Sequence, residues 1–242
     1  PLLEGTLTAE DDPCFESCNG RATFEVSGGV SPYSYSWGST SNEIDNLCAG
    51  DYGVTVTDIN GCSIGETYTI NQPTQLEYDT TFSHVICYGT HTGNANISVT
   101  GGTPPYQTMW SDGYNMMNNT DIEADIYQVT VYDAHGCSVF EQFNITQPDL
   151  LQVVTSGDFA ICEHQVVNIA AQPMGGTLPY TVYWDNGDGN GFAPGPQTFQ
   201  IIPHEDITYT VYVEDANGCI SNQATSQTIV SPEIFLDLTT ED

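Results

Sequence analysis

The sequence predicts an all-β protein: three tandem immunoglobulin-like antiparallel β-sandwich domains in an elongated array. The first observation is a segment that begins with two glycines and ends at a tryptophan. It occurs three times, and its copies start 73 and 74 residues apart, which is typical of a repeat array. The second is a polarity that alternates every two residues within each copy, as in a half-buried strand. The third is that no segment shows helical periodicity.

The three copies are Gly28–Trp37, Gly101–Trp110 and Gly175–Trp184. Paired glycines followed by proline predict a tight turn, because glycine accepts positive φ and proline fixes φ near −65°. A strand follows, with Trp37, Trp110 and Trp184 on its apolar face. These tryptophans could form an exposed stacking platform for sugars. We favour a core position against a disulfide, as in immunoglobulin domains.

A proline opens each unit and sets the expected boundaries. Repeat 1 spans 1–72, repeat 2 spans 73–147, and repeat 3 spans 148–231 with an acidic loop insertion; 232–242 begins a fourth repeat. Because each linker is essentially one proline long, we expect neighbouring repeats to meet with limited swing.

The remaining strands follow in the same order in every repeat. A strand before the glycine pair is expected at 22–26 and 95–99, and a strand after the variable loop at 52–58, 127–133 and 209–215. Asn60-Gly61, His135-Gly136 and Asn217-Gly218 then mark turns, and Asn-Gly predicts a two-residue hairpin. Closing strands are expected at 68–72 and 143–147, and Thr228–Ser231 closes repeat 3.

The charge restricts the partners. One Lys or Arg stands against 32 Asp and Glu, a net charge of −31. Phosphate backbones are bound through Lys and Arg, so nucleic acid and anionic membranes are excluded. No stretch approaches 18 apolar residues, so we expect no membrane insertion. The first residues lack the pattern of a signal peptide, and we expect an internal fragment of a longer or processed chain.

Eight cysteines in an acidic, strand-rich chain predict disulfides and an extracytoplasmic setting. Cys14, Cys87 and Cys162 hold equivalent positions before the glycine pair, and Cys62, Cys137 and Cys219 hold equivalent positions after it. We therefore predict the pairs Cys14–Cys62, Cys87–Cys137 and Cys162–Cys219, and a second bridge in repeat 1 between Cys18 and Cys48. A zinc site is disfavoured, because the cysteines are widely spaced and repeat 1 has no histidine.

No catalytic motif is present. The five histidines do not recur at equivalent positions, and no nucleophile elbow, zinc-protease motif or phosphate-binding loop occurs. A glycosidase needs only two carboxylates, but units this small leave little room for a cleft. We expect the chain not to be an enzyme.

A metal candidate lies in repeat 3, where Asp185-Asn186-Gly187-Asp188-Gly189-Asn190-Gly191 follows the tryptophan. Closely spaced Asp and Asn oxygens separated by glycine can surround Ca²⁺, with Asp185, Asp188 and Asn190 as ligands. The alternative, which we favour, is an acidic hairpin turn.

The motifs of repeats 1 and 2 resemble those of a known family. Gly-Gly-x-x-Pro-Tyr-x-x-x-Trp, then Gly50-Asp-Tyr-Gly-Val-Thr-Val-Thr-Asp-Ile-Asn-Gly-Cys62, then Ile-Asn-Gln-Pro, are similar to the SprB repeat of giant gliding-motility adhesins of Bacteroidetes. Repeat 3 departs in its longer loop and in Ser231-Pro232, and it also resembles polycystic-kidney-disease-type domains. The resemblance implies type IX secretion, display on the outer membrane and movement by the gliding machinery, and it carries no catalytic residues.

Two functions follow as expectations. The first is a structural stalk of a large cell-surface adhesin, whose partners are neighbouring repeats and, through other parts of the parent protein, the secretion and gliding machinery. The second is a calcium-dependent module that binds surface polysaccharide. A binding module should expose Tyr or Trp side chains, whereas a stalk should bury nearly all of them.

Overall fold

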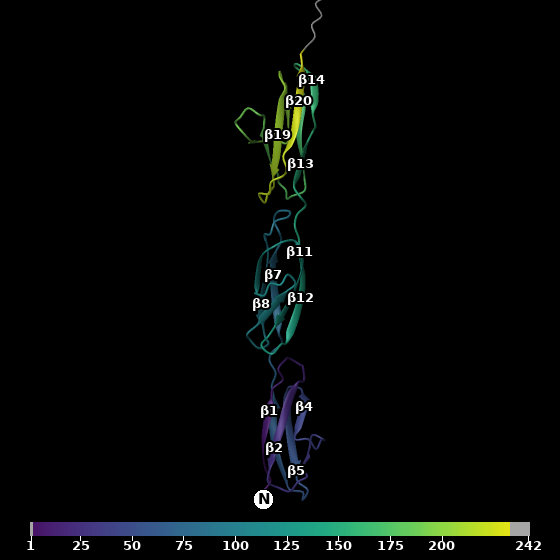
Figure 1. Cartoon of the computed structure of the whole chain (residues 1–242), viewed down its shortest axis with the longest axis vertical. Coiled ribbons are helices and arrows are strands. Elements are labelled where there is room, and N and C mark those ends of the chain that lie inside the picture. The colour runs from purple at the N-terminus through teal and green to yellow at the C-terminus, as the bar shows by residue number, and fades with distance from the viewer. Residues whose placement is uncertain (1, 233–242) are drawn as a thin grey trace, which may run out of the picture. The chain divides into compact units, whose positions relative to one another are not determined.

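The computed structural model describes residues 2–232, and these residues form strands and loops without a helix (Figure 1). The all-β prediction is thus confirmed. The expected start of a fourth repeat lies, apart from Pro232, outside the described residues. The described residues contain no helix long and apolar enough to cross a membrane.

The described chain divides into two compact units. The first comprises the residues up to Thr81 with Ala95–Asn119 and Ile126–Phe143. The second comprises Phe82–Asn94, Thr120–Asp125 and the residues from Asn144 onward. Each unit therefore contains one complete outer repeat and part of repeat 2.

Repeat 1 contains two three-stranded antiparallel sheets, with strand orders β1-β2-β4 and β3-β5-β6. Their strands are β1 (Glu4–Glu10), β2 (Gly20–Ser27), β3 (Ser34–Tyr35), β4 (Glu43–Leu47), β5 (Gly50–Thr57) and β6 (Ser63–Ile70). Buried positions alternate along β2, as expected for a strand with one face on a core. Phe24, Val54 and Val56 fill this core, and Ala22, Leu47 and Ile70 form its second cluster.

Repeat 2 has the same pattern of strands, with orders β10-β8-β7 and β12-β11-β9. The strands are β7 (Glu77–Ser83), β8 (Gly93–Thr100), β9 (Gln107–Trp110), β10 (Asn118–Ile122), β11 (Asp125–Tyr132) and β12 (Ser138–Ile145). β9 pairs with β11 in a register that sets Trp110 opposite Val129. Both side chains are buried, so this pair anchors the inner face of its sheet.

Repeat 3 is larger, with a three-stranded sheet β13-β15-β18 and a five-stranded sheet β14-β20-β19-β16-β17. The strands are β13 (Gln152–Thr155), β14 (Phe159–Cys162), β15 (Val167–Met174), β16 (Thr181–Asp185), β17 (Ala193–Gly195), β18 (Thr198–Ile201), β19 (Ile207–Glu214) and β20 (Ala224–Ser231). Its core contains Val153, Ile169, Val211 and Val213.

One pairing departs from the antiparallel prediction, because β14 is parallel to β20 (Figure 1). β13 and β14 are consecutive parts of one extended run. β13 pairs with β15 in one sheet and β14 pairs with β20 in the other. The chain crosses between the sheets at this point, which brings β14 alongside β20 in the same direction.

The turns after β5, β11 and β19 also differ from the prediction. A two-residue hairpin would need positive φ at both Asn60 and Gly61, but of the two only Gly61 has it, at 84°. The last pair between β5 and β6 is Thr57 with Ser63. The turn is therefore a five-residue loop, and an aspartate at its start determines its shape.

Candidate functional site

One buried aspartate organises the turn before each closing strand. Asp58, Asp133 and Asp215 are 6%, 5% and 5% exposed. In each case the Oδ1 atom accepts the backbone N–H of the cysteine four residues later, at 2.9 Å. The same Oδ1 atom accepts the N–H two residues later, also at 2.9 Å. The three second cysteines are thus held in identical turns.

The other oxygen of each aspartate fixes the glycine-pair loop. Oδ2 accepts the N–H of Val30 at 3.1 Å, of Thr103 at 2.9 Å and of Thr177 at 2.8 Å. Burial alone would raise the pKa of Asp58, but the backbone N–H donors outweigh it, and the pKa lies below its ordinary value. These aspartates were not among the residues expected to have a role. The signal was available, since Asp precedes each Asn-Gly-Cys or His-Gly-Cys by two residues.

The paired glycines allow two chain segments to approach closely. The first glycine has φ of 74°, 69° and 72° in the three copies. An added Cβ would lie 1.8 Å from the Leu2 carbonyl oxygen at Gly28 and 1.7 Å from the Gln75 carbonyl oxygen at Gly101. The tyrosine five residues later donates its hydroxyl to the carbonyl of this glycine, at 2.6, 2.6 and 2.5 Å. The motif therefore locks the start of each repeat against its glycine loop.

The first cysteines lie in a second recurrent turn. The carbonyls of Cys14, Cys87 and Cys162 accept the N–H three residues later, at 3.3, 3.2 and 3.4 Å. The residue two positions after each cysteine has positive φ: Glu16 at 54°, Gly89 at 70° and His164 at 67°. All three first cysteines thus have the same backbone geometry.

In repeat 1 a buried carboxylate supports this turn. Asp12 is 1% exposed, and it accepts the Ser17 hydroxyl and, at 2.7 Å, the N–H of Cys18. Burial would raise the pKa of Asp12, but these hydrogen bonds outweigh it and lower the pKa.

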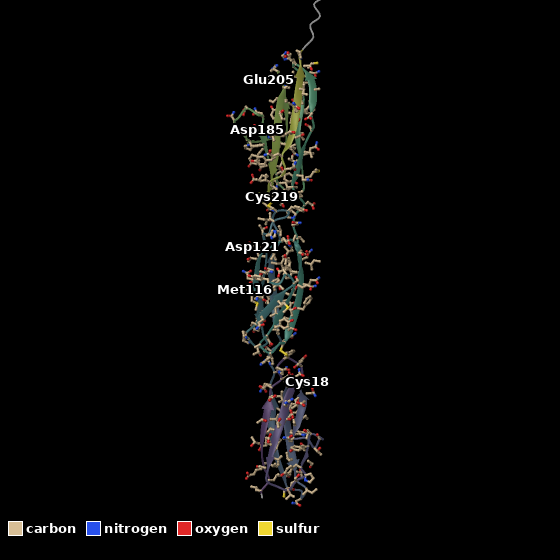
Figure 2. All side chains as sticks on the ribbon, in the orientation of Figure 1. Cys18, Met116, Asp121, Asp185, Glu205 and Cys219 are labelled. Carbon is tan, nitrogen blue, oxygen red and sulfur yellow. A yellow bond between two sulfur atoms is a disulfide. The ribbon has the colours of Figure 1, made fainter. Side chains whose placement is uncertain are left out.

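The disulfides overturn most of the predicted pairing. Cys14 is bonded to Cys137, with Cα atoms 5.7 Å apart, and Cys87 is bonded to Cys219, also at 5.7 Å. Cys18 pairs with Cys48, as predicted. The predicted pairs Cys14–Cys62, Cys87–Cys137 and Cys162–Cys219 are wrong, and Cys62 and Cys162 are free and exposed. Figure 2 labels Cys18 and Cys219, each a member of one of the observed bonds.

The physical reason is that the two cysteines of a repeat lie at opposite ends of its closing strand. Cys62 immediately precedes β6. The Cys14 turn lies at the far end of β6, where the Glu16 N–H donates to Gln72 Oε1 at 2.8 Å. Eight residues of strand span about 26 Å, whereas a disulfide needs Cα atoms within about 7 Å. A bond between these two cysteines of one repeat is therefore impossible, and each observed long-range bond joins consecutive repeats.

The tryptophans pack into the cores of their repeats. Trp110 is 2% exposed and Trp184 is 8% exposed, and Trp37 is half-buried. Each indole N–H donates to a backbone carbonyl: Trp37 to Ser41 at 2.9 Å, Trp110 to Met116 at 2.8 Å and Trp184 to Pro196 at 3.0 Å. Phe143 and Phe199 pack edge-on against the second and third indoles.

The acidic loop uses its side chains to cap its own backbone. The Gly187 N–H donates to the Asp185 carboxylate at 2.8 Å, and the Asn190 N–H donates to Asp188 at 2.9 Å. Figure 2 labels Asp185, at the end of β16. The hydrogen bonds from Asn190 lower the pKa of Asp188. Within residues 2–232, no three His, Cys, Asp or Glu side chains lie close enough together to hold a metal ion.

A shallow cavity of about 350 Å³ borders this loop. Its lining residues are Trp184, Asn186, Asp188, Asn190, Gly191, Ala193, Pro194, Gly195, Pro196, Phe199 and Tyr209. It thus places aromatic rings beside amide and carboxylate groups.

Paired sheets with alternating inward residues define the class: an immunoglobulin-like all-β protein. Solved structures similar to the chain include the three-domain ectodomain of mouse nectin-like molecule 4. That structure is 11% identical, with 85% of this chain and 83% of that chain covered and a TM-score of 0.35. The PKD domain of human KIAA0319 is 15% identical, with 37% and 88% covered and a TM-score of 0.28. The sialic acid binding region of a Streptococcus sanguinis adhesin is 8% identical, with 85% and 79% covered and a TM-score of 0.24.

The SprB repeat family matches residues 6–42 and 80–115. The chain therefore contains a region of SprB repeats. No curated protein matches the chain.

Proposed function

We propose that this chain is a non-enzymatic stalk segment of a very large secreted adhesin, displayed on the cell surface and used in gliding and attachment. SprB repeats occur in cell-surface adhesins, and both the repeat and the immunoglobulin-like fold are non-enzymatic in kind. In this proposal the repeats transmit load and set length. Export by type IX secretion and contact with the gliding machinery depend on other parts of the parent protein.

The observation that carries the stalk proposal is that all three tryptophans and most tyrosines are buried or half-buried. No tryptophan among residues 2–232 is exposed, and the exposed tyrosines there are Tyr88 and Tyr114. The repeated aromatics support the sandwiches from within.

We also propose that 1–72, 73–147 and 148–231 are the structural repeats of the stalk. Every hydrogen-bonded sheet takes its strands from one of these ranges. The disulfides Cys14–Cys137 and Cys87–Cys219 fasten repeat 1 to repeat 2 and repeat 2 to repeat 3.

The purified chain, applied to a surface-polysaccharide array with Ca²⁺ and then with EDTA, tests the stalk proposal. We expect no saturable binding in either condition. Saturable binding on the array that depends on an intact repeat fold would refute a purely structural role.

The cavity beside the acidic loop favours a second function, a calcium-dependent module that binds polysaccharide. Sugars bind proteins through aromatic faces and polar groups side by side, and Trp184, Tyr209 and Asp188 provide that combination here. Each carboxylate has about four lone-pair sites, so Asp185 and Asp188 keep acceptor capacity beyond the loop hydrogen bonds that they accept.

The variant Asp188→Asn separates this function from the stalk. Its side chain keeps a carbonyl oxygen for the Asn190 N–H but loses the charge that Ca²⁺ requires. If the second function is correct, the parent chain binds the array with Ca²⁺ and the variant loses that binding. Asp206→Asn, at an exposed residue outside the loop, is the matched control and should bind normally.

A further inference from the structure

Two histidines of repeat 3 lie against each other, His164 in the turn after β14 and His204 in the loop between β18 and β19. Their ring centroids are 5.1 Å apart, edge to face. Figure 2 labels Glu205, the neighbour of His204, at the opposite end of repeat 3 from Cys219. We propose that this histidine pair is a zinc site, in which one nitrogen of each imidazole binds Zn²⁺. The site belongs to repeat 3 itself and does not depend on what the chain binds.

The separation of the two rings suits a shared metal ion. A zinc–nitrogen bond is about 2.0 Å long and an imidazole nitrogen lies about 1.1 Å from its ring centre, so two imidazoles on a tetrahedral ion have centroids about 5 Å apart. The histidine pair already has this spacing. The χ2 torsion of histidine is broad, and it turns the ring about an axis that passes near the ring centre. The two nitrogens can therefore converge without movement of either backbone segment.

Both histidines are carried by backbone that is fastened to the same strand, β20. Beside His164, the Glu163 N–H donates to the carbonyl of the last residue of β20, at 3.1 Å. Beside His204, the Asp206 carboxylate accepts a backbone N–H of β20 at 2.8 Å. Ligands that are held in place before the metal arrives lose little conformational freedom when they bind it, which favours affinity.

The surroundings of the pair are negatively charged. A glutamate precedes His164, and Glu205 and Asp206 follow His204. Repeat 3 contains no Lys or Arg, and the whole chain has a net charge of −31, which raises the local concentration of cations. Imidazole is a good ligand for zinc, whereas Ca²⁺ and Mg²⁺ prefer oxygen. The histidines thus select zinc from the cations that the charge attracts.

The coordination that the protein supplies is incomplete. Among residues 2–232, no third His, Cys, Asp or Glu side chain completes a metal-ligating group with the pair. Water molecules therefore take the remaining positions around the ion. A site of this kind binds zinc reversibly and less tightly than a structural site with four protein ligands.

The corresponding turn and loop are also joined in the other repeats, by different chemistry. In repeat 1 they carry Cys18 and Cys48, which form a disulfide. In repeat 2 the same positions carry His91 and Glu123, whose nitrogen and oxygen lie 3.9 Å apart. Zinc on the histidine pair joins the two segments of repeat 3 in the same way.

A following repeat does not cover this location. The side chains of His91 and Glu123 are 64% and 65% exposed, although repeat 3 is bonded to repeat 2 through Cys87 and Cys219. A further repeat attached after repeat 3 in the same way would leave the histidine pair open to zinc from solution.

Isothermal titration calorimetry of the complete chain with Zn²⁺ tests the site. Cys62 and Cys162 are first replaced with serine, because exposed thiols also bind zinc, and excess Mg²⁺ occupies sites made of carboxylates. We expect one site per chain with a Kd below about 100 µM. His164→Gln and His204→Gln should each weaken it at least about tenfold, because the second imidazole binds as an intramolecular ligand. The matched control His135→Gln removes an exposed histidine outside the pair and should leave the Kd unchanged.

Carbethoxylation of the histidines, measured by mass spectrometry, locates the bound ion. Zn²⁺ should protect His164 and His204 together and leave His91 and His135 reactive. The absence of a site in this affinity range, zinc binding that survives either single variant, an equal loss in His135→Gln, or protection spread evenly over the histidines would each overturn the proposal. The two rings would then make an aromatic contact and nothing more.

Discussion

Replacing Gly101 with alanine should destabilise repeat 2 far more than the same change at Gly113. Both glycines are left-handed, with φ of 69° and 87°, so alanine costs about 1–2 kcal/mol at either position from backbone strain alone. The two sites differ in the space available. A Cβ at Gly101 would lie 1.7 Å from the Gln75 carbonyl oxygen, and a Cβ at Gly113 would meet nothing within 4 Å.

The overlap at Gly101 must push two backbone segments apart. The displacement threatens the hydrogen bond from Gly102 N–H to Thr74 O at 2.9 Å and the bond from the Tyr106 hydroxyl to Gly101 O at 2.6 Å. Overpacking of this kind costs about 1–3 kcal/mol beyond the strain. We therefore expect Gly101→Ala to lose about 2–5 kcal/mol and Gly113→Ala to lose about 1–2 kcal/mol.

Native-state hydrogen exchange of the intact, oxidised chain measures both variants in the same fold. Peptides from β8 report the opening free energy of repeat 2, and peptides from repeat 3 should be unchanged in both variants. Equal losses at the two glycines would refute the close-approach argument, because only backbone strain would then remain.

Three further outcomes are expected. Cys18→Ala with Cys48→Ala opens a loop of 30 residues and should lower the unfolding free energy of repeat 1 by about 3–4 kcal/mol in urea titrations; a loss below about 1 kcal/mol would contradict this. Asp58 has a pKa below its ordinary 3.8, so its contribution is present above pH 3.8 and is lost as the pH falls through the folded-state pKa. Asp58→Asn should therefore flatten the acid-unfolding curve below pH 3.8, and an unchanged curve would exclude this role. Tyr180→Phe removes the hydrogen bond from the tyrosine hydroxyl to Gly175 O at 2.5 Å. It should lower the unfolding free energy of repeat 3 by about 0.5–1.5 kcal/mol, measured by thermal unfolding; an unchanged stability would contradict this.

The repeat, the strands and the tryptophan core could be predicted because they depend on local patterns. Period-two alternation places Tyr35 and Trp110 inward wherever the strand lies in the sandwich, and both are buried. The equivalence of the two sets of cysteines was also visible from their spacing.

The cysteine pairing could not be predicted from that equivalence. Bonds within a repeat and bonds between repeats both join a first cysteine to a second one, so the spacing fits either pattern. The choice depends on which end of the closing strand each cysteine occupies, and that is a property of the folded sheets. The pair Cys18–Cys48 could be predicted, because both cysteines belong to repeat 1 and have no equivalents in the other repeats.

The bonds between repeats change how the chain responds to tension. A force applied at the two termini of an unbonded chain would eventually draw out all 242 residues. With Cys14 joined to Cys137 and Cys87 joined to Cys219, the shortest covalent path crosses from Cys14 to Cys137, runs back along the chain to Cys87, and crosses to Cys219. Residues 15–86 and 138–218 lie off this path and carry no tension even if their repeats unfold. Fewer than half of the residues then lie on the shortest covalent path. A segment bonded in this way gains little length under load, even when its repeats unfold, and returns to its folded length when the pull stops.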